Sequence, residues 1–369
     1  MRPLNLYWIW LTHIPGVGPA AQRQLLTHFG SPQAVFAADC AALKKVPGIA
    51  NTQAETIYNH RCLDPAKRCL DNLQAADMTV LTVQDRQFPV AAREHRRLPV
   101  VFYIWGTIPV HERAIAVFGT RQASAYGLRL AAEAAQALAD YSLQLVSVLS
   151  EGINRQALAT YLQANQAPLA IAPGGRGAGG RFDEQTIRRV AETGAVVYLH
   201  PPGMPWQKQH VRQCSALLSA WATAGLLIEA PAKSGALATA RAFMENDRPL
   251  LAAPHHLDAR RGQGNNILLQ SGARIYLGSK QLSQYADGGC SATARTQNPQ
   301  EAPMADDSIQ QQILSLASQG PCLLDEVLAV LGKTHDHNAI LGAVSALEIQ
   351  GKVELKSSWL QLPAGRVQP

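Results

Sequence analysis

The chain has 369 residues and a net charge of +6, with 47% hydrophobic and 16% charged residues. This composition excludes a disordered protein, and the length suffices for two or three domains with full apolar cores. The apolar runs stay well short of the roughly 20 residues that a bilayer span needs. We therefore predict a soluble cytoplasmic protein that makes no membrane contact.

Residues 1–75 predict a helical domain with two similar turns. Residues 14–18 (IPGVG) and 46–49 (VPGI) each place an apolar residue, a proline and a glycine before a helix. These turns resemble helix-hairpin-helix turns, whose backbone N–H groups can contact a phosphodiester backbone. The second turn has Ala50 where a closing glycine is expected, and such paired turns also serve as plain packing units.

Residues 76–285 alternate short apolar runs with helical patterns. The predicted strands are 78–83, 99–105, 114–118, 144–149, 169–172, 195–198, 225–229 and 249–252, and the predicted helices are 128–139, 154–164, 183–192, 211–222 and 235–246. Strands that are apolar throughout and alternate with helices indicate a parallel sheet covered on both faces. The expected fold class is α/β, an extended Rossmann-like doubly wound sheet with its ligand crevice at the carboxyl ends of the strands.

The C-terminal part is predicted to be a linker and a small domain. Residues 286–305 are rich in Ser, Thr, Ala, Gln, Gly and Pro, which indicates the linker. Residues 306–369 predict a winged-helix-like domain of three helices, 308–318, 323–331 and 338–350, followed by two short strands. Because the helix in the recognition position has no Lys or Arg and the domain carries a net charge of −3, we expect packing or partner contacts there rather than DNA binding.

The turn at 119–127 (GTRQASAYG) is the most informative segment. It lies between an apolar strand and a long Ala-rich helix, so free N–H groups and the positive end of the helix dipole would face an anion in the turn. Arg121 adds a forked donor that suits phosphate oxygens. An ordinary structural turn between a strand and a helix explains the same pattern.

Four segments in order resemble the DNA-processing protein A (DprA/Smf) family. They are GTRQASAYG at 119–127, VSVLSEGIN at 146–154, KSGALATA at 233–240 and RRGQGNNILLQSGA at 260–273. With the helical front domain and the winged-helix-like tail, the resemblance covers nearly the whole chain. It implies a recombination mediator without enzymatic activity that binds single-stranded DNA, loads the RecA recombinase during natural transformation, and forms a homodimer through the Rossmann domain.

The chain departs from this family at a basic segment, F-P-x-R-N-R, which the family uses to hold the DNA backbone and stack a base. Here Val211 replaces the aromatic residue, and Cys214, Ser215 and Ala216 replace the RNR triplet. Leu199 also replaces a glutamate of the family. The lost contacts predict DNA binding that is weak or carried by neighbouring residues.

The predicted DNA-binding residues lie in the turn and at two further helix starts. They are Gly119, Thr120, Arg121, Ser124, Tyr126, Gly127, Lys208, Arg212, Lys233, Ser234, Gly235 and Asn265. Arg121 is expected to be the main contact, and the backbone N–H groups and hydroxyl of Ser124 to share the same anion.

Other residues carry secondary expectations. Trp206 would be a substitute stacking platform or a buried loop anchor, and Arg155, Arg176 and Arg181 would either widen the basic surface or remain solvated charges. Glu229, at the end of a strand, is expected to be a structural partner of a helix N-terminus rather than an acid catalyst.

We expect no catalytic residues, no metal and no cofactor. The six cysteines form no CxxC pair, and the histidine pairs His255 with His256 and His335 with His337 lack the spacing and carboxylate of a metal site. Two alternatives stay open. Residues 173–180 (PGGRGAGG) resemble the phosphate loop of lysine-decarboxylase-like phosphoribohydrolases, which suggests a nucleotide-binding or hydrolysing protein, and a diverged member could act by protein contacts alone.

Overall fold

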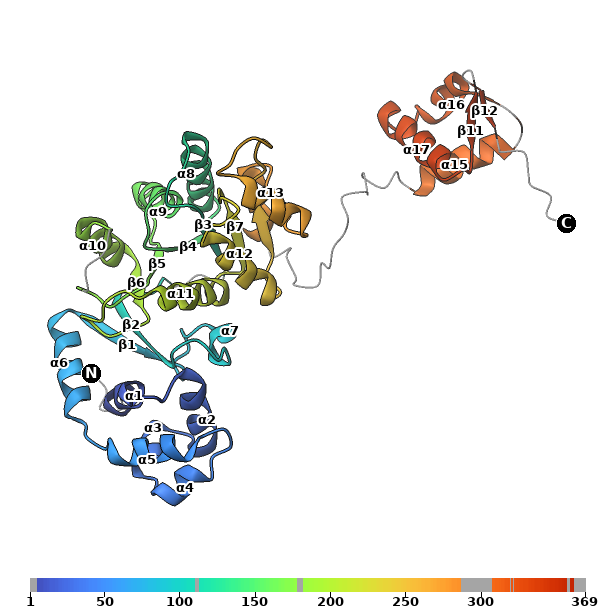
Figure 1. Cartoon of the computed structure of the whole chain (residues 1–369). Coiled ribbons are helices and arrows are strands. Elements are labelled where there is room, and N and C mark those ends of the chain that lie inside the picture. The colour runs from blue at the N-terminus through green and yellow to red at the C-terminus, as the bar shows by residue number, and fades with distance from the viewer. Residues whose placement is uncertain are drawn as a thin grey trace. The chain divides into compact units, whose positions relative to one another are not determined.

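The computed structural model describes residues 5–109, 113–177, 182–286, 307–318, 320, 322–356 and 359–361, with only the backbone described at 208, 209, 286, 307, 308, 349, 356 and 361. The chain divides into two compact units, Met1–Ala294 and Arg295–Pro369 (Figure 1). Apart from residue 286, the predicted linker lies outside the described residues.

The first unit begins with six short helices. They are α1 (Asn5–His13), α2 (Pro19–Phe29), α3 (Pro32–Ala37), α4 (Cys40–Lys44), α5 (Asn51–Asn59) and α6 (Asp64–Ala75). The two turns expected from the sequence connect α1 to α2 and α4 to α5. Gly16 and Gly48 have φ angles of 71° and 82° in these turns, a conformation that strains any residue with a side chain.

A nine-stranded sheet follows, in the order β1-β2-β6-β5-β4-β3-β7-β8-β9. The strands are β1 (Met78–Thr82), β2 (Val101–Gly106), β3 (Ala114–Phe118), β4 (Gln144–Val148), β5 (Leu169–Ala172), β6 (Ala195–Tyr198), β7 (Ala224–Leu227), β8 (Leu250–Ala252) and β9 (Arg274–Ile275). Pairing is parallel from β6 to β9, which confirms the predicted doubly wound class, whereas β1 and β2 pair antiparallel at one edge. The two-residue strand β9 is too short to give a sequence pattern.

Helices cover both faces of the sheet, as Figure 1 shows. Ile115 and Val117 of β3 share a core with α8 (Ala125–Asp140), α9 (Ile153–Gln163) and α10 (Glu184–Thr193), and this core continues into the helical domain. Ala116 and Phe118 face the other core, which includes α7 (Val90–Arg93), α11 (Lys208–Trp221), α12 (Ala236–Glu245) and α13 (Gln263–Gln270). The short η1 (Ser279–Leu282) and α14 (Ser283–Ala286) close this unit. Because both of their faces are buried, the central strands β3, β5, β6 and β7 are apolar at every position.

The second unit has the predicted winged-helix-like pattern. Its elements are α15 (Asp307–Ser318), β10 (Cys322–Leu323), α16 (Leu324–Leu331), α17 (His337–Ile349), β11 (Glu354–Lys356) and β12 (Trp359–Gln361). The strands form an antiparallel sheet in the order β10-β12-β11. Ile313, Ile340, Leu347 and Leu360 are fully buried in a separate apolar core, so this unit has its own source of stability.

Candidate nucleic-acid interface

The turn between β3 and α8 is held by the segment that follows β4. The N–H of Gly119 donates to Asn154 Oδ1 at 3.1 Å, and a Cβ at Gly119 would lie 2.7 Å from Ile153 Cγ1. Gly152, with φ 75°, packs so closely that a Cβ there would lie 2.6 Å from the carbonyl oxygen of Arg121. The family-like segments at 119–127 and 146–154 therefore pack against each other, and together they shape the loop around Arg121.

The N-terminus of α8 holds an anion that belongs to the protein itself. The N–H and the hydroxyl of Ser124 both donate to the Glu229 carboxylate, each at 2.7 Å, and Glu229 is only 2% exposed. The Ser124 hydroxyl also accepts from the N–H of Gly127, and a Cβ at Gly127 would lie 2.6 Å from Glu229 Oε2. Glu229 thus has the helix contact that we expected of it.

This arrangement corrects the predicted roles of three residues in the turn. Both donors of Ser124 are occupied by Glu229, and Gly127 leaves room for that carboxylate rather than for a phosphate. Thr120 is 8% exposed, and its hydroxyl accepts from the N–H of Gln122. The Glu229 carboxylate already accepts the hydrogen bonds of Ser124 at the N-terminus of α8. We therefore do not expect a phosphate to bind in the turn at Ser124.

Arg121 and Tyr126 are exposed residues of the turn, as are Gln122 and Ala125. Arg121 is exposed, and within the described part of the chain its guanidinium has no ion pair or hydrogen bond. The ring of Tyr126 is 38% exposed, and its hydroxyl donates to the Pro254 carbonyl at 3.3 Å. An open cation beside an anchored aromatic ring is a suitable surface for a strand of nucleic acid.

The start of α12 lies at the neighbouring strand end. The N–H of Thr120 donates to the Glu229 carbonyl at 2.7 Å, which joins the loops after β3 and β7. Further along the second loop, Lys233 and Gly235 are exposed, and the Ser234 hydroxyl caps α12 by accepting from the N–H of Ala236 at 3.2 Å. Lys233 therefore adds a second exposed cation at the carboxyl edge of the sheet.

Asn265 is a structural residue, contrary to its predicted DNA contact. It is fully buried, and its Nδ2 lies within hydrogen-bond distance of the carbonyl oxygens of Leu227, Ile228 and Ala253, at 2.9 to 3.1 Å. These carbonyls lie at the ends of β7 and β8. Asn265 therefore ties two strand ends together and cannot reach a ligand on the surface.

Helix α11 buries the positions at which the family has its RNR triplet. Cys214, Ser215 and Ala216, at the positions of the family's RNR triplet, are 2%, 5% and 6% exposed. Burial raises the pKa of the Cys214 thiol to about 12, so it carries no charge at neutral pH. The side chain of Lys208 lies outside the described residues, and that of Trp206 is 45% exposed.

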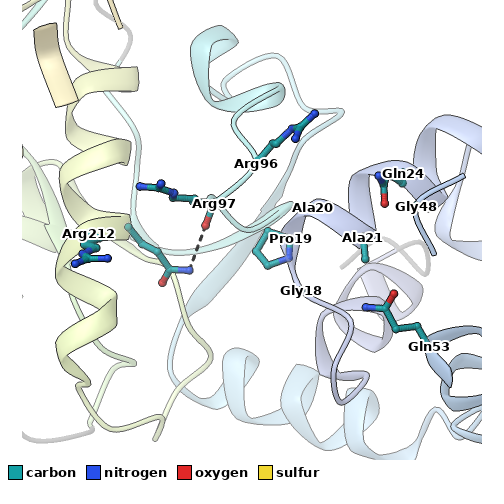
Figure 2. Close-up of a pocket in the computed structure, with 11 residues that line it drawn as sticks. Gly18, Pro19, Ala20, Ala21, Gln24, Gly48, Gln53, Arg96, Arg97 and Arg212 are labelled. Carbon is teal, nitrogen blue, oxygen red and sulfur yellow. Dashed lines mark hydrogen bonds between the residues drawn. The ribbon is translucent and has the colours of Figure 1, made fainter. Parts of the chain in front are cut away.

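Arg212 is exposed but lines a cavity of about 690 Å³ that includes no residue of the 119–127 turn (Figure 2). Arg96 and Arg97 line the same cavity. Neither was among the residues predicted from the sequence. Both arginines lie in an irregular loop before β2, where neither periodicity nor a motif distinguishes them.

Arg155 and Arg176, which could have widened the basic surface, both contact other residues of the protein. Arg155 pairs with Glu151 at 3.2 Å and with Asp183 at 3.6 Å. The Arg176 guanidinium lies 3.3 Å from the ring centroid of Trp105 and donates to the Ala76 carbonyl. The contacts of Arg176 make it part of the fold, Arg155 stays exposed within its ion pairs, and Arg181 lies outside the described residues.

The buried His210 of α11 forms a pair with the half-buried His200. The rings of His200 and His210 are 3.8 Å apart, and burial together with the neighbouring His210 lowers the pKa of His200 to about 4. His200 is therefore neutral at physiological pH. Among the described residues, no group of three or more His, Cys, Asp or Glu side chains could hold a metal ion, and no described helix combines the length and hydropathy of a membrane span.

The fold is thus a helical domain with a pair of similar turns joined to a Rossmann-like sheet, which carries exposed cations at the carboxyl ends of its strands. Residues 79–287 match the family described as DNA recombination-mediator protein A, and residues 11–60 match a SAM-like helix-hairpin-helix tandem. The chain belongs to the DNA recombination-mediator protein A family.

The similarity to known proteins covers most of the chain. Protein Smf from Synechocystis is 27% identical over 75% of this chain and 71% of its own length. A putative DNA processing protein DprA from Mycobacterium tuberculosis is 26% identical over 98% of this chain and 96% of its own length. The X-ray structure of DNA processing protein A from Streptococcus pneumoniae shares the fold, with a TM-score of 0.61, 18% identity, and coverage of 76% of this chain and 98% of that one.

Proposed function

We propose that this protein binds single-stranded DNA across the carboxyl ends of β3 and β7. Arg121 carries the proposal, because it is exposed, unpaired among the described residues and held in place by Gly152. Lys233 supplies a second cation on the adjoining loop, and the exposed ring of Tyr126 offers a stacking surface. Phosphate contacts and stacking of this kind bind single strands with little sequence preference.

Family membership supports the wider role. We propose that the bound strand is protected and passed to the RecA recombinase during natural transformation, that the protein does this in the cytoplasm as a homodimer through its Rossmann domain, and that it catalyses no reaction. A pull-down with RecA, in the presence and absence of single-stranded DNA, tests the partner. Sedimentation of the protein alone tests the homodimer.

The alternative of a nucleotide-binding or hydrolysing protein gains no support from residues 173–177. The N–H of Gly175 donates to the Met204 carbonyl at 2.9 Å, and a Cβ at Gly175 would collide with the Pro201 carbonyl oxygen. The loop is therefore packed against the segment after β6 rather than open to a phosphate. Residues 178–180 of this motif lie outside the described part of the chain.

The test of DNA binding is a titration of labelled oligothymidylate with wild-type protein and Arg121→Ala at several salt concentrations. Loss of one phosphate contact should weaken binding and reduce the slope of log K against log salt by about 0.7. Arg188→Ala, which removes an exposed arginine from α10, is the matched control and should leave the slope unchanged. Equal affinities for wild type and Arg121→Ala would contradict the proposed site.

A further inference from the structure

Three arginines line one side of a cavity where the helical domain meets the Rossmann-like sheet. We call it the arginine pocket, and define it by Arg96, Arg97, Arg212 and the two glycine turns at Gly18 and Gly48 (Figure 2). All three arginines are exposed, and no carboxylate lines the cavity. Within the described residues, none of the three guanidinium groups has an ion pair or hydrogen bond, so the pocket concentrates positive charge without an internal counter-ion.

The loop that carries Arg96 and Arg97 is anchored on both sides. From the helical domain, the Arg23 guanidinium donates to the carbonyls of Ala92, Arg93 and Leu98. Burial lowers the pKa of Arg23 to about 10, which still leaves it charged at neutral pH. From α11, Gln213 Nε2 donates to the Arg97 carbonyl at 3.2 Å. The backbone that places these arginines is therefore held in a defined position.

The opposite wall consists of the two helix-hairpin-helix-like turns. Gln53 connects them, because its Nε2 donates to the Gly16 carbonyl at 2.9 Å and its Oε1 accepts from the N–H of Ala50 at 3.1 Å. Helix α2 begins at this wall, and no described residue accepts a hydrogen bond from the N–H groups of Ala20 or Ala21. Both residues line the same cavity as the arginines.

The groups that line the arginine pocket indicate which kind of ligand it can bind. Guanidinium groups and free N–H groups at a helix start bind phosphate oxygens. No aromatic ring lines the cavity, so a nucleobase finds no stacking partner there. A site with several phosphate donors and no surface for a base recognises a sugar-phosphate backbone rather than a free nucleotide.

We propose that the arginine pocket is a second DNA site, which holds the phosphodiester backbone of a single strand. The proposal rests on the proposed function, since it assigns a further part of the protein to the same ligand. It also gives the helical domain a direct role, because its two turns form one wall of the site.

The test compares full-length wild type with the triple variant Arg96→Ala, Arg97→Ala and Arg212→Ala in the oligothymidylate titration. Loss of three phosphate contacts should reduce the salt slope by about 2 and weaken binding at low salt. The matched control removes three exposed arginines outside the pocket, Arg68, Arg188 and Arg189. The thermal midpoint should stay unchanged in both triple variants, because all six side chains are exposed.

The outcomes separate the two proposals. If the pocket variant has the same salt slope as the control variant, the second site is overturned. The proposed function stays intact in that case if Arg121→Ala still shows its expected loss of DNA affinity. Conversely, a full effect of the pocket variant together with an unchanged Arg121→Ala supports the pocket and overturns the site at the carboxyl ends of β3 and β7. Wild type without salt-dependent binding overturns both.

Discussion

At the scale of single residues, Glu229 decides how the turn after β3 works. Its buried carboxylate occupies the helix position at which a bound phosphate was expected, and it uses both donors of Ser124. Arg121, two residues from Gly119, is left facing solvent. The turn therefore presents a side-chain cation to a ligand and keeps its backbone donors for the fold.

Replacement of Glu229 by alanine should lower the free energy of unfolding by about 3 kcal/mol, because it leaves the N–H and hydroxyl of Ser124 without their charged acceptor. Urea unfolding followed by tryptophan fluorescence measures the change. Glu245→Ala, which removes an exposed carboxylate from α12, is the control and should have an effect within about 0.5 kcal/mol. Equal stabilities of the two variants would show that the Glu229 contact does not support the fold.

Asn265 offers a second test at this scale. In Asn265→Asp, a carboxylate would face three carbonyl oxygens, whereas Asn265→Ala only removes the donor. We expect both variants to be destabilised, the alanine variant by about 2 kcal/mol and the aspartate variant by more. Thermal unfolding would give the order, and an aspartate variant as stable as wild type would contradict the buried position.

At the scale of elements, α11 shows how one helix can change its role. Residues 214–216, at the positions of the family's RNR triplet, are buried here, and Arg212 is the exposed residue among the described side chains of α11. The helix packs in the core with α12 and supports Gln213, which anchors the loop of the arginine pocket. Arg212 and Gln213 both line the arginine pocket.

Restoring arginine at positions 214 and 216 should therefore damage the protein rather than improve DNA binding. Cys214→Arg combined with Ala216→Arg would bury two guanidinium groups in an apolar core, a loss of more than about 4 kcal/mol. Soluble yield and the thermal midpoint would report the effect. The control Ala232→Arg adds a single arginine at an exposed position and should fold normally. A stable double variant with tighter DNA binding would refute this assignment.

At the scale of the whole molecule, the charge is divided between the compact units. Residues 1–285 carry the positive charge and contain both proposed DNA sites, while residues 306–369 have a net charge of −3 and a separate core. We therefore expect the second unit to have little electrostatic attraction to a phosphate backbone.

A chain that ends at residue 294 should bind oligothymidylate within about twofold of the full-length affinity and with the same salt slope, since no phosphate contact is lost. The same anisotropy titration makes the measurement, with circular dichroism to confirm that the shortened chain is folded. A tenfold or larger loss would assign a DNA contact to the C-terminal unit.

Local patterns in the sequence were enough to predict most helices and strands of the sheet and its parallel class. The reason is physical: a strand buried on both faces is apolar at every position, and each helix repeats its apolar face along the chain. The expected helix contact of Glu229 also came from its place at a strand end. Family-like segments predicted the loop that presents Arg121.

Only the tertiary structure decided which polar groups are free to meet a ligand. Glu229 is 105 residues from Ser124, and Arg23 holds carbonyls about 70 residues away, so neither contact leaves a local pattern. The same holds for the arginine pocket, which brings together α2, the loop before β2 and α11. Periodicity reports whether a side chain is buried, but the partner that satisfies it depends on how distant segments pack.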